Sequence, residues 1–223
     1  MAPCVNSVAL CDGRSHGGAV VQRIPSVRVC QSGQVRIIAG KWRNTRLPVP
    51  AIAGLRPTTD RVRETLFNWL TPCLAGARVL DLFAGSGALG IEAISRGARS
   101  CVLVERHRQL YAQLCERVAH LHAQTQLEVI RADAIRWLQQ TPVHPFDLVF
   151  CDPPFDQALW HWLYPVLTPH LVPSARIYIE SPARCPADPP PGCQLDRQGR
   201  TAEVHFALYR YCAEGAGTLR PLL

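Results

Sequence analysis

The chain has 223 residues, of which 48% are apolar and 18% are charged. This length has room for one α/β domain with a sizeable core and a short extension, and the composition excludes a disordered chain. No apolar run is long enough for a membrane span, and the ten cysteines include no C-x-x-C pair and no Cys/His cluster at zinc spacing. We therefore expect a cytoplasmic protein with reduced thiols, no membrane contact and no metal site.

The net charge of +7 is concentrated in the first 70 residues, which hold ten basic and three acidic side chains. The rest of the chain holds 14 of each and is neutral. A basic N-terminal segment on an otherwise neutral chain suits a protein that binds a polyanion on one face. A solubilising tail would show the same bias, so charge alone does not decide between the two.

Residues 1–33 lack steady periodicity and are predicted to be a disordered leader. Ordered structure is predicted over 34–75, first as a small hairpin around Ala39-Gly40-Lys41 and then as a helix that begins near Thr58 or Thr59. The apolar side chains of this helix fall on one face, and its arginines, Arg61 and Arg63 among them, are expected to lie mostly off that face. The basic N-terminal segment is therefore predicted to be structured in part, which favours a binding surface over a solubilising tail.

From residue 76 to 212 the pattern alternates strand and helix. Strands are predicted at 77–83, 100–105, 127–132, 146–151 and 175–180, and helices at 87–97, 106–124, 133–140 and 156–168. The apolar runs lack period-two alternation, as in parallel strands covered on both faces. Two more strands, 193–198 and 202–211, follow without a helix, so they must be antiparallel to each other. This predicts a doubly wound α/β sheet of five parallel strands that is completed by an antiparallel pair, followed by a tail over 213–223.

The stretch DLFAGSGALG places Gly85, Gly87 and Gly90 at the spacing G-x-G-x-x-G of a dinucleotide-binding loop. The same bend serves other adenosine-bearing cofactors, so the loop alone leaves the cofactor open. Asp81 stands four positions ahead of Gly85, and a carboxylate there would repel a pyrophosphate. It would favour a cofactor with a sulfonium and an ammonium group, as in S-adenosylmethionine.

Further carboxylates close the next strands, at the edge where open α/β sheets bind ligands. Glu105 lies 20 residues after Gly85, where an acid commonly binds a ribose, and this fits NAD and S-adenosylmethionine equally. The alternative for Glu105 is an acid that only caps the next helix. Asp133 opens the next helix as its N-cap, as a contact for the adenine amino group, or as both.

The segment FCDPPF ends the fourth strand and carries Asp152, Pro153, Pro154 and Phe155. The prolines remove two amide donors, so the segment presents carbonyls and the Asp152 carboxylate as acceptors. Such acceptors would hold the N–H groups of an exocyclic amine and aim its lone pair at a methyl carbon, while Phe155 would stack on a flipped base. A plain strand-ending turn is the alternative. Alternation points Cys151 away from Asp152, which predicts a core thiol.

Four segments together resemble the bacterial small-subunit ribosomal RNA guanine-N2 methyltransferases of the RsmD family. They are VRIIAGKWRNTRLPVP, LRPTTDRVRETLFNWL, VLDLFAGSGALGIEAISRGA and FDLVFCDPPF. The glycine loop and D-P-P-F are shared by many amino-methyltransferases, whereas RPTTDRVRETLFNWL is far more specific to this family. The likeness runs from about residue 35 to 211, with a longer leader and an expanded proline-rich stretch at 182–191.

The resemblance implies a class I S-adenosylmethionine-dependent methyltransferase fold: a Rossmann-like, seven-stranded sheet with its last strand antiparallel, plus a small N-terminal hairpin and helix. It implies methylation of one guanine N2 in 16S rRNA during small-subunit assembly, by a monomer with S-adenosylmethionine as cofactor. The predicted cofactor-binding residues are Asp81, Phe83, Gly85, Gly87, Glu105, Asp133 and Ala134. The predicted catalytic residues are Asp152, Pro153, Pro154 and Phe155. The predicted RNA-binding residues are Arg36, Lys41, Arg43, Arg46, Arg56, Arg61 and Arg63.

Three other functions compete with this interpretation. A DNA adenine-N6 methyltransferase would also use an Asp-Pro-Pro-aromatic segment, but it would usually need a target-recognition domain for which the chain has little room. An NAD-dependent oxidoreductase would have no use for the D-P-P-F segment. A non-catalytic RNA-binding module would not need the acids at the strand ends.

Overall fold

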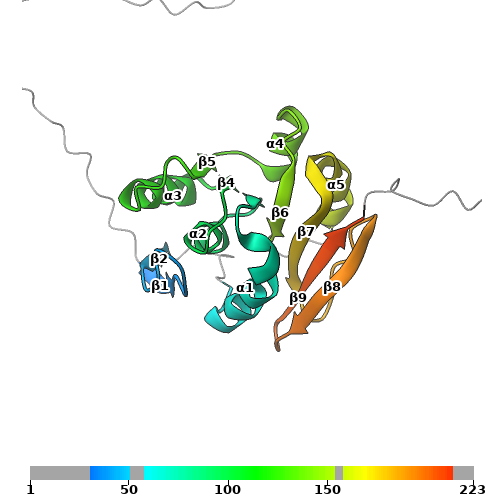
Figure 1. Ribbon diagram of the computed structural model, residues 1–223, viewed down its shortest axis with the longest axis horizontal. Coiled ribbons are helices and arrows are strands. Elements are labelled where there is room, and N and C mark those ends of the chain that lie inside the picture. Colours follow the sequence, from blue (N-terminus) through cyan, green and yellow to red (C-terminus); the bar gives the residue numbers. More distant parts are fainter. Residues whose placement is uncertain (1–30, 51–57, 154–157, 213–223) are drawn as a thin grey trace, which may run out of the picture.

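The computed structural model describes residues 31–50, 58–153 and 158–212 (Figure 1). Residues 1–30 of the predicted leader over 1–33, the predicted tail over 213–223, and the predicted site residues Arg56, Pro154 and Phe155 lie outside these ranges. Within them, none of the helices combines the length and the hydrophobicity that crossing a bilayer requires.

The N-terminal part forms the predicted hairpin and helix. Strands β1 (Gln31–Arg36) and β2 (Arg46–Pro50) pair antiparallel, and helix α1 (Asp60–Leu74) follows. Thr59 caps α1 by accepting a hydrogen bond from the Val62 amide. The hairpin differs from the prediction in two ways: it begins three residues earlier, at Gln31, and its connection spans 37–45 rather than a tight turn.

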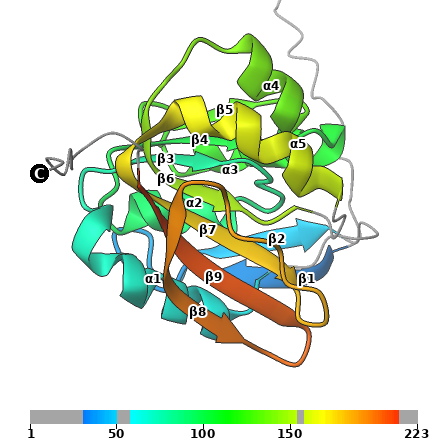
Figure 2. The same ribbon diagram turned by 90° about the vertical axis from the view of Figure 1, so that its right-hand side faces the viewer.

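A seven-stranded sheet forms the body of the molecule, in the order β5-β4-β3-β6-β7-β9-β8. Its strands are β3 (Arg78–Asp81), β4 (Ser100–Val104), β5 (Leu127–Ile130), β6 (Phe146–Cys151), β7 (Leu171–Pro182), β8 (Cys193–Arg200) and β9 (Val204–Tyr211). The first five are parallel, and β9 lies between β7 and β8, antiparallel to both (Figure 2). The predicted sheet with its last strand antiparallel is therefore confirmed.

Gly199 lies within β8, although the predicted strands 193–198 and 202–211 leave it in the connection between them. It pairs in register with Phe206, and a Cβ atom on Gly199 would lie 2.3 Å from the Phe206 ring. The glycine is therefore needed because an aromatic ring from the neighbouring strand covers it, and not because the chain turns there.

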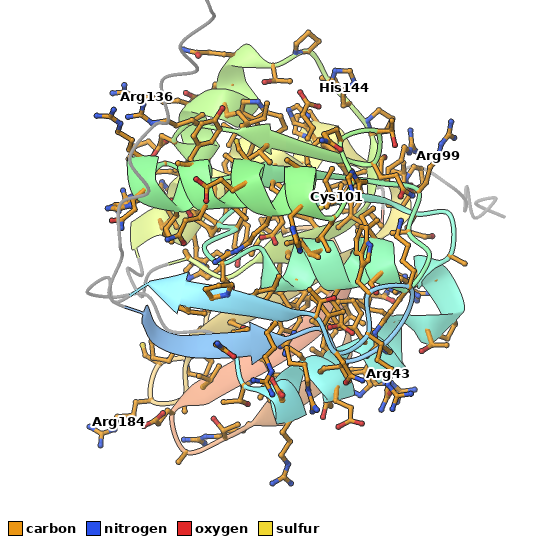
Figure 3. All side chains as sticks on the ribbon, turned by 90° about the vertical axis from the view of Figure 1, so that its left-hand side faces the viewer. Arg43, Arg99, Cys101, Arg136, His144 and Arg184 are labelled. Atoms are coloured by element: carbon orange, nitrogen blue, oxygen red, sulfur yellow. The ribbon has the colours of Figure 1, made fainter. Side chains whose placement is uncertain are left out.

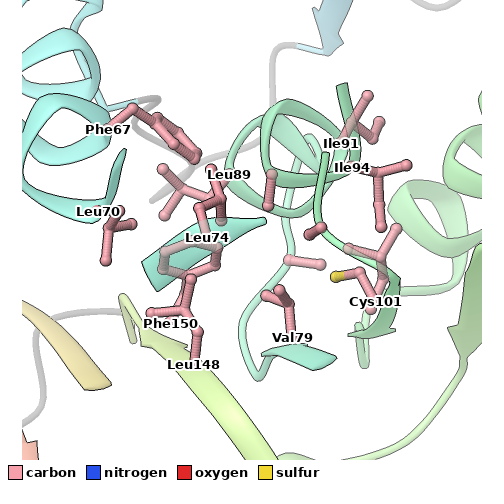
Figure 4. Packing of buried hydrophobic residues seen from close by; sticks show 14 of the residues in the cluster. Phe67, Leu70, Leu74, Val79, Leu89, Ile91, Ile94, Cys101, Leu148 and Phe150 are labelled. Carbon is pink, nitrogen blue, oxygen red and sulfur yellow. The ribbon is translucent and has the colours of Figure 1, made fainter. Parts of the chain in front are cut away.

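Helices cover both faces of the sheet. One face packs against α1, α2 (Ala88–Ser95) and α3 (Arg108–His120) in a single buried cluster that also includes Ile37 and Leu47 from the hairpin segment (Figure 4). The other face packs against α4 (Ala134–Gln140) and α5 (Ala158–Leu167). The runs without alternation indicated this arrangement, because strands with helices on both sides need apolar side chains on both faces.

The hairpin segment is fixed to α2 through the buried carboxylate of Glu92. Its oxygens accept hydrogen bonds from the amides of Ile38 (2.8 Å) and Ala39 (3.0 Å). Next to them, Gly40 has a φ of +84°, and a Cβ atom on it would lie 1.8 Å from the Ser95 carbonyl oxygen. The loop therefore lies directly on the end of α2, which explains the glycine.

Arg63 does not lie off the apolar face of α1, so that prediction was wrong. Its side chain has no solvent exposure and contacts Glu92 (3.4 Å), Asp60 (2.7 Å) and the carbonyl of Arg36 (2.6 Å). This buried arginine is tolerated because two acids and a carbonyl accept hydrogen bonds from its Nη1 and Nη2 groups, although its Nε–H has no hydrogen-bond partner among the described residues. We therefore remove Arg63 from the predicted RNA-binding residues.

Candidate functional site

The three glycines of the loop have separate structural roles. Gly85 (φ +53°) and Gly87 (φ +76°) adopt left-handed backbone conformations, and Gly87 stands at the N-terminus of α2. A Cβ atom on Gly90 would lie 2.3 Å from the Leu103 side chain and 2.8 Å from the sulfur of Cys101. Gly90 therefore allows α2 to pack closely on the sheet, while the other two turn the chain at the predicted cofactor site.

Asp81 ends β3 and is buried, and its Oδ2 accepts a hydrogen bond from the Gly90 amide (3.1 Å). The pKa of Asp81 is raised to about 7, chiefly by burial and in part by the charge of Glu105, while the amides of Gly90 and Phe83 oppose the rise. A buried acid with such a pKa is strongly stabilised by a nearby cation. The position therefore suits a cationic group and disfavours a phosphate.

Glu105, at the end of β4, is buried and bound to the glycine loop. Its Oε2 accepts a hydrogen bond from the Gly85 amide (2.9 Å), and its Oε1 accepts one from the His107 amide (2.6 Å) at the start of α3. Glu105 thus holds both the glycine loop and the start of α3, and its ribose contact stays a prediction, because each carboxylate oxygen has two lone pairs and can accept a further hydrogen bond.

The remaining predicted cofactor residues surround the same strand ends. Asp133 is exposed and is the N-cap of α4, with its side chain accepting a hydrogen bond from the Arg136 amide (3.2 Å). Ala134 is buried, and Phe83 is partly buried against the core on the α4 side. The capping role of Asp133 is confirmed, whereas its contact with adenine stays a prediction.

Asp152 follows β6, next to the strand that carries Asp81. Phe150 pairs in register with Asp81, so Asp152 lies two residues beyond the level of that acid. Burial raises the pKa of Asp152 well above its ordinary value, the charges of Glu180 and Asp81 add to the rise, and the Thr58 hydroxyl opposes it. Cys151 is fully buried on the opposite face of the sheet, as predicted for a core thiol.

Glu180, in β7, is a buried acid that the sequence interpretation missed. Its Oε1 accepts hydrogen bonds from the hydroxyls of Thr58 (2.7 Å) and Tyr178 (2.8 Å). Thr58 belongs to the RPTTDRVRETLFNWL segment, so this segment contacts the acceptor end of the site. The rule that acids close the parallel strands would have found Glu180, had it been applied to the fifth predicted strand.

Arg117, in α3, was also missed, and it joins the glycine loop to the hairpin. Its guanidinium donates hydrogen bonds to the carbonyls of Ser86 (2.5 Å) and Pro48. Burial lowers the pKa of Arg117 to about 10, which leaves the group charged at neutral pH. Nothing in the sequence distinguishes this arginine from its exposed neighbours on a helix.

Of the predicted basic side chains that the structure describes, all except Arg63 are exposed, and they lie at two different edges of the sheet. Arg61 is in the first turn of α1, near Thr58 and hence near the strand ends that carry the acids. Lys41 contacts Gln126, just before β5, and its amide bonds the last residue of α2. Lys41 and Arg43 therefore lie towards the amino ends of the parallel strands, the side where Figure 3 also shows Arg99.

The acids give the site a distinctive charge. The charges that raise the pKa values of Asp81 and Asp152 are those of other carboxylates, which would repel a pyrophosphate. They suit a cofactor with a sulfonium and an ammonium group. In the part of the chain that the structure describes, no three His, Cys, Asp or Glu side chains are grouped as a metal ion would need. With the strand order, this site defines an S-adenosylmethionine-dependent methyltransferase and contradicts the NAD-dependent alternative.

The chain belongs to the family described as Conserved hypothetical protein 95, whose model matches residues 35–210. It is 44% identical over 187 residues to ribosomal RNA small subunit methyltransferase D of Escherichia coli, covering 82% of this chain and 93% of that protein. It is 42% identical over 182 residues to the protein of the same name from Haemophilus influenzae, covering 80% and 94%. The predicted family is therefore confirmed.

Solved structures agree with this assignment. The putative methyltransferase yhhF from Escherichia coli is similar with a TM-score of 0.73 and 41% identity, covering 82% of this chain and 100% of that chain. An RNA methyltransferase from Salinibacter ruber, solved with S-adenosyl-L-homocysteine, shares the fold at a TM-score of 0.57 and 15% identity, covering 74% and 100%.

Proposed function

We propose that this protein transfers a methyl group from S-adenosylmethionine to the exocyclic N2 of a specific guanine in 16S rRNA during assembly of the small ribosomal subunit. The observation that carries the proposal is the placement of Asp152 after β6, beside the strand that ends in the buried acid Asp81. The two relatives named for ribosomal RNA small subunit methylation support the choice of RNA.

The cofactor half of the site fits the proposed donor. S-adenosylmethionine, when bound, supplies an electrophilic methyl carbon on a positively charged sulfur. Asp81 would attract the positive charge at the amino-acid end, and the backbone at Gly85 and Gly87 allows close approach. Glu105 would bind the ribose and Asp133 the adenine amino group, with Phe83 and Ala134 beside them.

The acceptor half is built to direct an aromatic amine. An exocyclic amine on a base is a poor nucleophile because its lone pair is delocalised into the ring. The Asp152 carboxylate and the Pro153 carbonyl would hold the two N2 protons and leave the lone pair directed at the methyl carbon. Asp152 is then in place to accept one proton from N2 after N2 has gained the methyl group, and its raised pKa makes it a better base. Phe155 would stack on the flipped base.

The basic side chains would bind the RNA backbone. Arg36, Arg46 and Arg61 are exposed on β1, β2 and α1, and Arg61 follows Thr58, whose hydroxyl binds Glu180, by three residues. Lys41 and Arg43 would extend this contact along the hairpin towards the opposite edge of the sheet. Contacts of this kind position the RNA, and the pocket at Asp152 selects the base.

The test is a methyl-transfer assay with isotope-labelled S-adenosylmethionine. The full chain is incubated in parallel with undermethylated small subunits, with naked 16S rRNA and with DNA, and the products are digested and analysed by nucleoside mass spectrometry. We expect N2-methylguanosine at one position of the 16S rRNA. Label on an adenine N6 in DNA would favour the competing function, and no label in any substrate would contradict both.

A further inference from the structure

Four exposed arginines follow the ends of β4 and β5, at the carboxyl edge of the parallel strands. Arg106 comes directly after Glu105, and Arg108 is the first residue of α3. Arg131 comes directly after β5, and Arg136 is in the first turn of α4. We call this set the β4/β5 arginine cluster: Arg106, Arg108, Arg131 and Arg136.

The backbone brings the members of the cluster together. Val104 of β4 pairs in register with Ile130 of β5, and the Glu105 amide donates to the Ile130 carbonyl (2.9 Å) just beyond that pair. Arg131 therefore continues its strand at the level of Glu105, with about 4.8 Å between the two backbones. Arg131 is also within electrostatic reach of Tyr111, in the first turn of α3. The four arginines thus belong to one side of the carboxyl edge.

The charges of the cluster are not neutralised within the described part of the chain. The arginines that form ion pairs there lie elsewhere in the fold: Arg36, Arg63, Arg78, Arg96 and Arg176. The acids next to the cluster in the chain are already bound to backbone amides. Glu105 is buried and holds two amides, and the Asp133 side chain caps α4. Exposed like charges without partners create a positive potential that attracts an anion from solution.

The cofactor does not account for these arginines. In dinucleotide enzymes an arginine near this edge accommodates the 2′-phosphate of NADP, and S-adenosylmethionine has no phosphate at all. The proposed reaction does bring a polyanion to this edge, because the target base has to reach Asp152. Arginine is also the side chain best suited to phosphate, since its planar guanidinium can donate two parallel hydrogen bonds to it.

The cluster and Arg61 lie on opposite sides of Asp152. The strand order β5-β4-β3-β6-β7 places the cluster at one end and Asp152 after the fourth of these strands. Arg61 is at the other end, three residues after Thr58, whose hydroxyl binds Glu180 of β7. Five neighbouring strands span about 19 Å, which corresponds to about six nucleotides of a helical strand at about 3.4 Å each. An RNA strand that crosses this edge passes Asp152 between two basic surfaces.

Figure 3 separates the cluster from the other basic side chains of the molecule. It shows Arg136 on the opposite side of the molecule from Arg43 and Arg99, which lie towards the amino ends of the strands. The cluster is therefore not an extension of the surface that Lys41 and Arg43 form on the hairpin segment.

We propose that the β4/β5 arginine cluster is a second RNA-binding surface, which holds the sugar–phosphate backbone on the side of the target base opposite Arg61. This inference rests on the proposed methylation of RNA. It adds a contact outside the basic N-terminal segment, and it requires RNA on both sides of the target guanine. Phosphate contacts of this kind fix the register of the RNA and leave the choice of base to the pocket at Asp152.

The experiment measures the affinity of the full chain for transcribed 16S rRNA by filter binding across a salt series. The variant is the double replacement Arg131→Ala/Arg136→Ala. Its matched control is Arg197→Ala/Arg200→Ala, which removes two exposed arginines from β8 at the far edge of the sheet. We expect the cluster variant to reduce the slope of log K against log salt by about 1.5, and to bind about 30-fold more weakly at about 0.1 M salt. The control should change neither quantity.

Three further readouts separate RNA binding from other roles of the cluster. In the methyl-transfer assay we expect the KM for RNA to rise in the cluster variant while kcat at saturating RNA is kept. Calorimetry should give an unchanged Kd for S-adenosylmethionine, and thermal unfolding should give an unchanged Tm, because the two side chains are exposed and have no ion-pair partner among the described residues.

An unchanged salt slope in the cluster variant would overturn the proposal, and so would an equal change in the β8 control. A weaker Kd for S-adenosylmethionine with an unchanged slope would assign the arginines to the cofactor, which also overturns it. The proposed function fails separately, if the wild-type protein methylates no guanine N2 in the transfer assay. Filter binding needs no methyl transfer, so the two failures are distinguishable.

Discussion

Arg63 and Glu92 form an ion pair whose two side chains have no exposure to solvent, with 3.4 Å between Nη1 and Oε2. Glu92 also binds Arg96 (2.7 Å) and the amides of Ile38 and Ala39. One carboxylate thus joins the hairpin segment, α1 and α2. The N-terminal basic segment is therefore part of the same core as the sheet, and the surfaces it presents are held rigidly relative to the cofactor site.

Replacing Glu92 should destabilise the protein strongly. Glu92→Ala leaves the guanidinium of Arg63 buried with one acid fewer and removes the acceptor of two loop amides. We expect a loss of about 3–5 kcal/mol in the free energy of unfolding, the usual cost of breaking a buried pair from one side. Denaturant unfolding measures it. The matched control is Asp60→Asn, since Asp60 is half exposed and its loss should cost less, about 1 kcal/mol. Equal losses would contradict the central position given to Glu92.

Cofactor affinity should depend on pH through Asp81. Its pKa of about 7 means that the carboxyl becomes protonated as the pH falls below neutrality, and a neutral acid attracts a cation less. We expect the Kd for S-adenosylmethionine to rise by up to about tenfold per pH unit below 7. Asp81→Asn should bind weakly at every pH, with no such slope. Calorimetric titrations from pH 5.5 to 8.5 make the comparison, and identical slopes for the two proteins would rule out Asp81 as the group responsible.

The same group affects the stability of the cofactor-free protein in the opposite direction. The folded pKa of about 7 exceeds the ordinary value of 3.8, so folding takes up a proton between these limits. Stability is therefore lost as the pH rises through this window, and the loss is complete above about 7. Asp81→Asn should raise Tm at pH 8 and have little effect below pH 4. A lower Tm at pH 8 would contradict this account.

Arg117 should connect the hairpin to cofactor binding. Arg117→Lys keeps a positive charge, but a single ammonium group cannot reproduce the fork that binds the carbonyls of Ser86 and Pro48. The glycine loop then loses the hydrogen bond from Arg117 to the Ser86 carbonyl. We therefore expect about tenfold weaker binding of S-adenosylmethionine, equal to about 1.4 kcal/mol. Gln113→Ala is the control, because it removes only a long contact to Arg117 (3.4 Å). Comparable losses in the two variants would show that the carbonyl contacts do not matter.

The exposed arginines should contribute to the salt dependence of RNA affinity. Arg61→Ala and Arg36→Ala should each weaken binding to 16S rRNA and reduce the slope of log K against log salt by about one. Arg197→Ala, on the edge strand β8, is the control and should leave the slope unchanged. Filter binding across a salt series gives the slopes. An effect of Arg197 equal to that of Arg61 would place the RNA elsewhere.

Most of the fold was predictable because its signals are local. Apolar runs without alternation identified the parallel strands, and the absence of a helix before the last strand identified the antiparallel ending. The boundaries were less certain: α3 is shorter than its predicted span of 106–124, and β7 extends beyond 175–180 at both ends. Pairing partners determine where a strand ends, and these are not visible in a single segment.

The cofactor half of the site was predictable for a related reason. Asp81 ends β3, Glu105 follows β4 directly and Asp133 lies three residues beyond β5, and parallel strands bring their carboxyl ends to one edge. The contacts of Arg117 and Glu180 were not predictable, because they join residues far apart in the chain. Arg117 and Pro48 are 69 positions apart, and Thr58 and Glu180 are 122 apart.

Arg63 shows why the charge of a side chain does not by itself predict its exposure to solvent. Helical periodicity gave the apolar stripe of α1, and an arginine beside that stripe was expected to reach solvent. The acid that buries it, Glu92, is a charged residue within the apolar helix α2, whose residues are all buried. A lone acid in such a helix requires a buried partner, and this was the available signal for the pair.

The most direct test of the central claim is the position and the amount of methyl label that wild-type protein and Asp152→Ala transfer to small-subunit RNA. We expect the wild-type protein to produce N2-methylguanosine at one site, and the variant to lose at least about 100-fold in rate while its calorimetric affinity for S-adenosylmethionine changes little. Methyl label on another base, or undiminished transfer by the variant, would contradict the account.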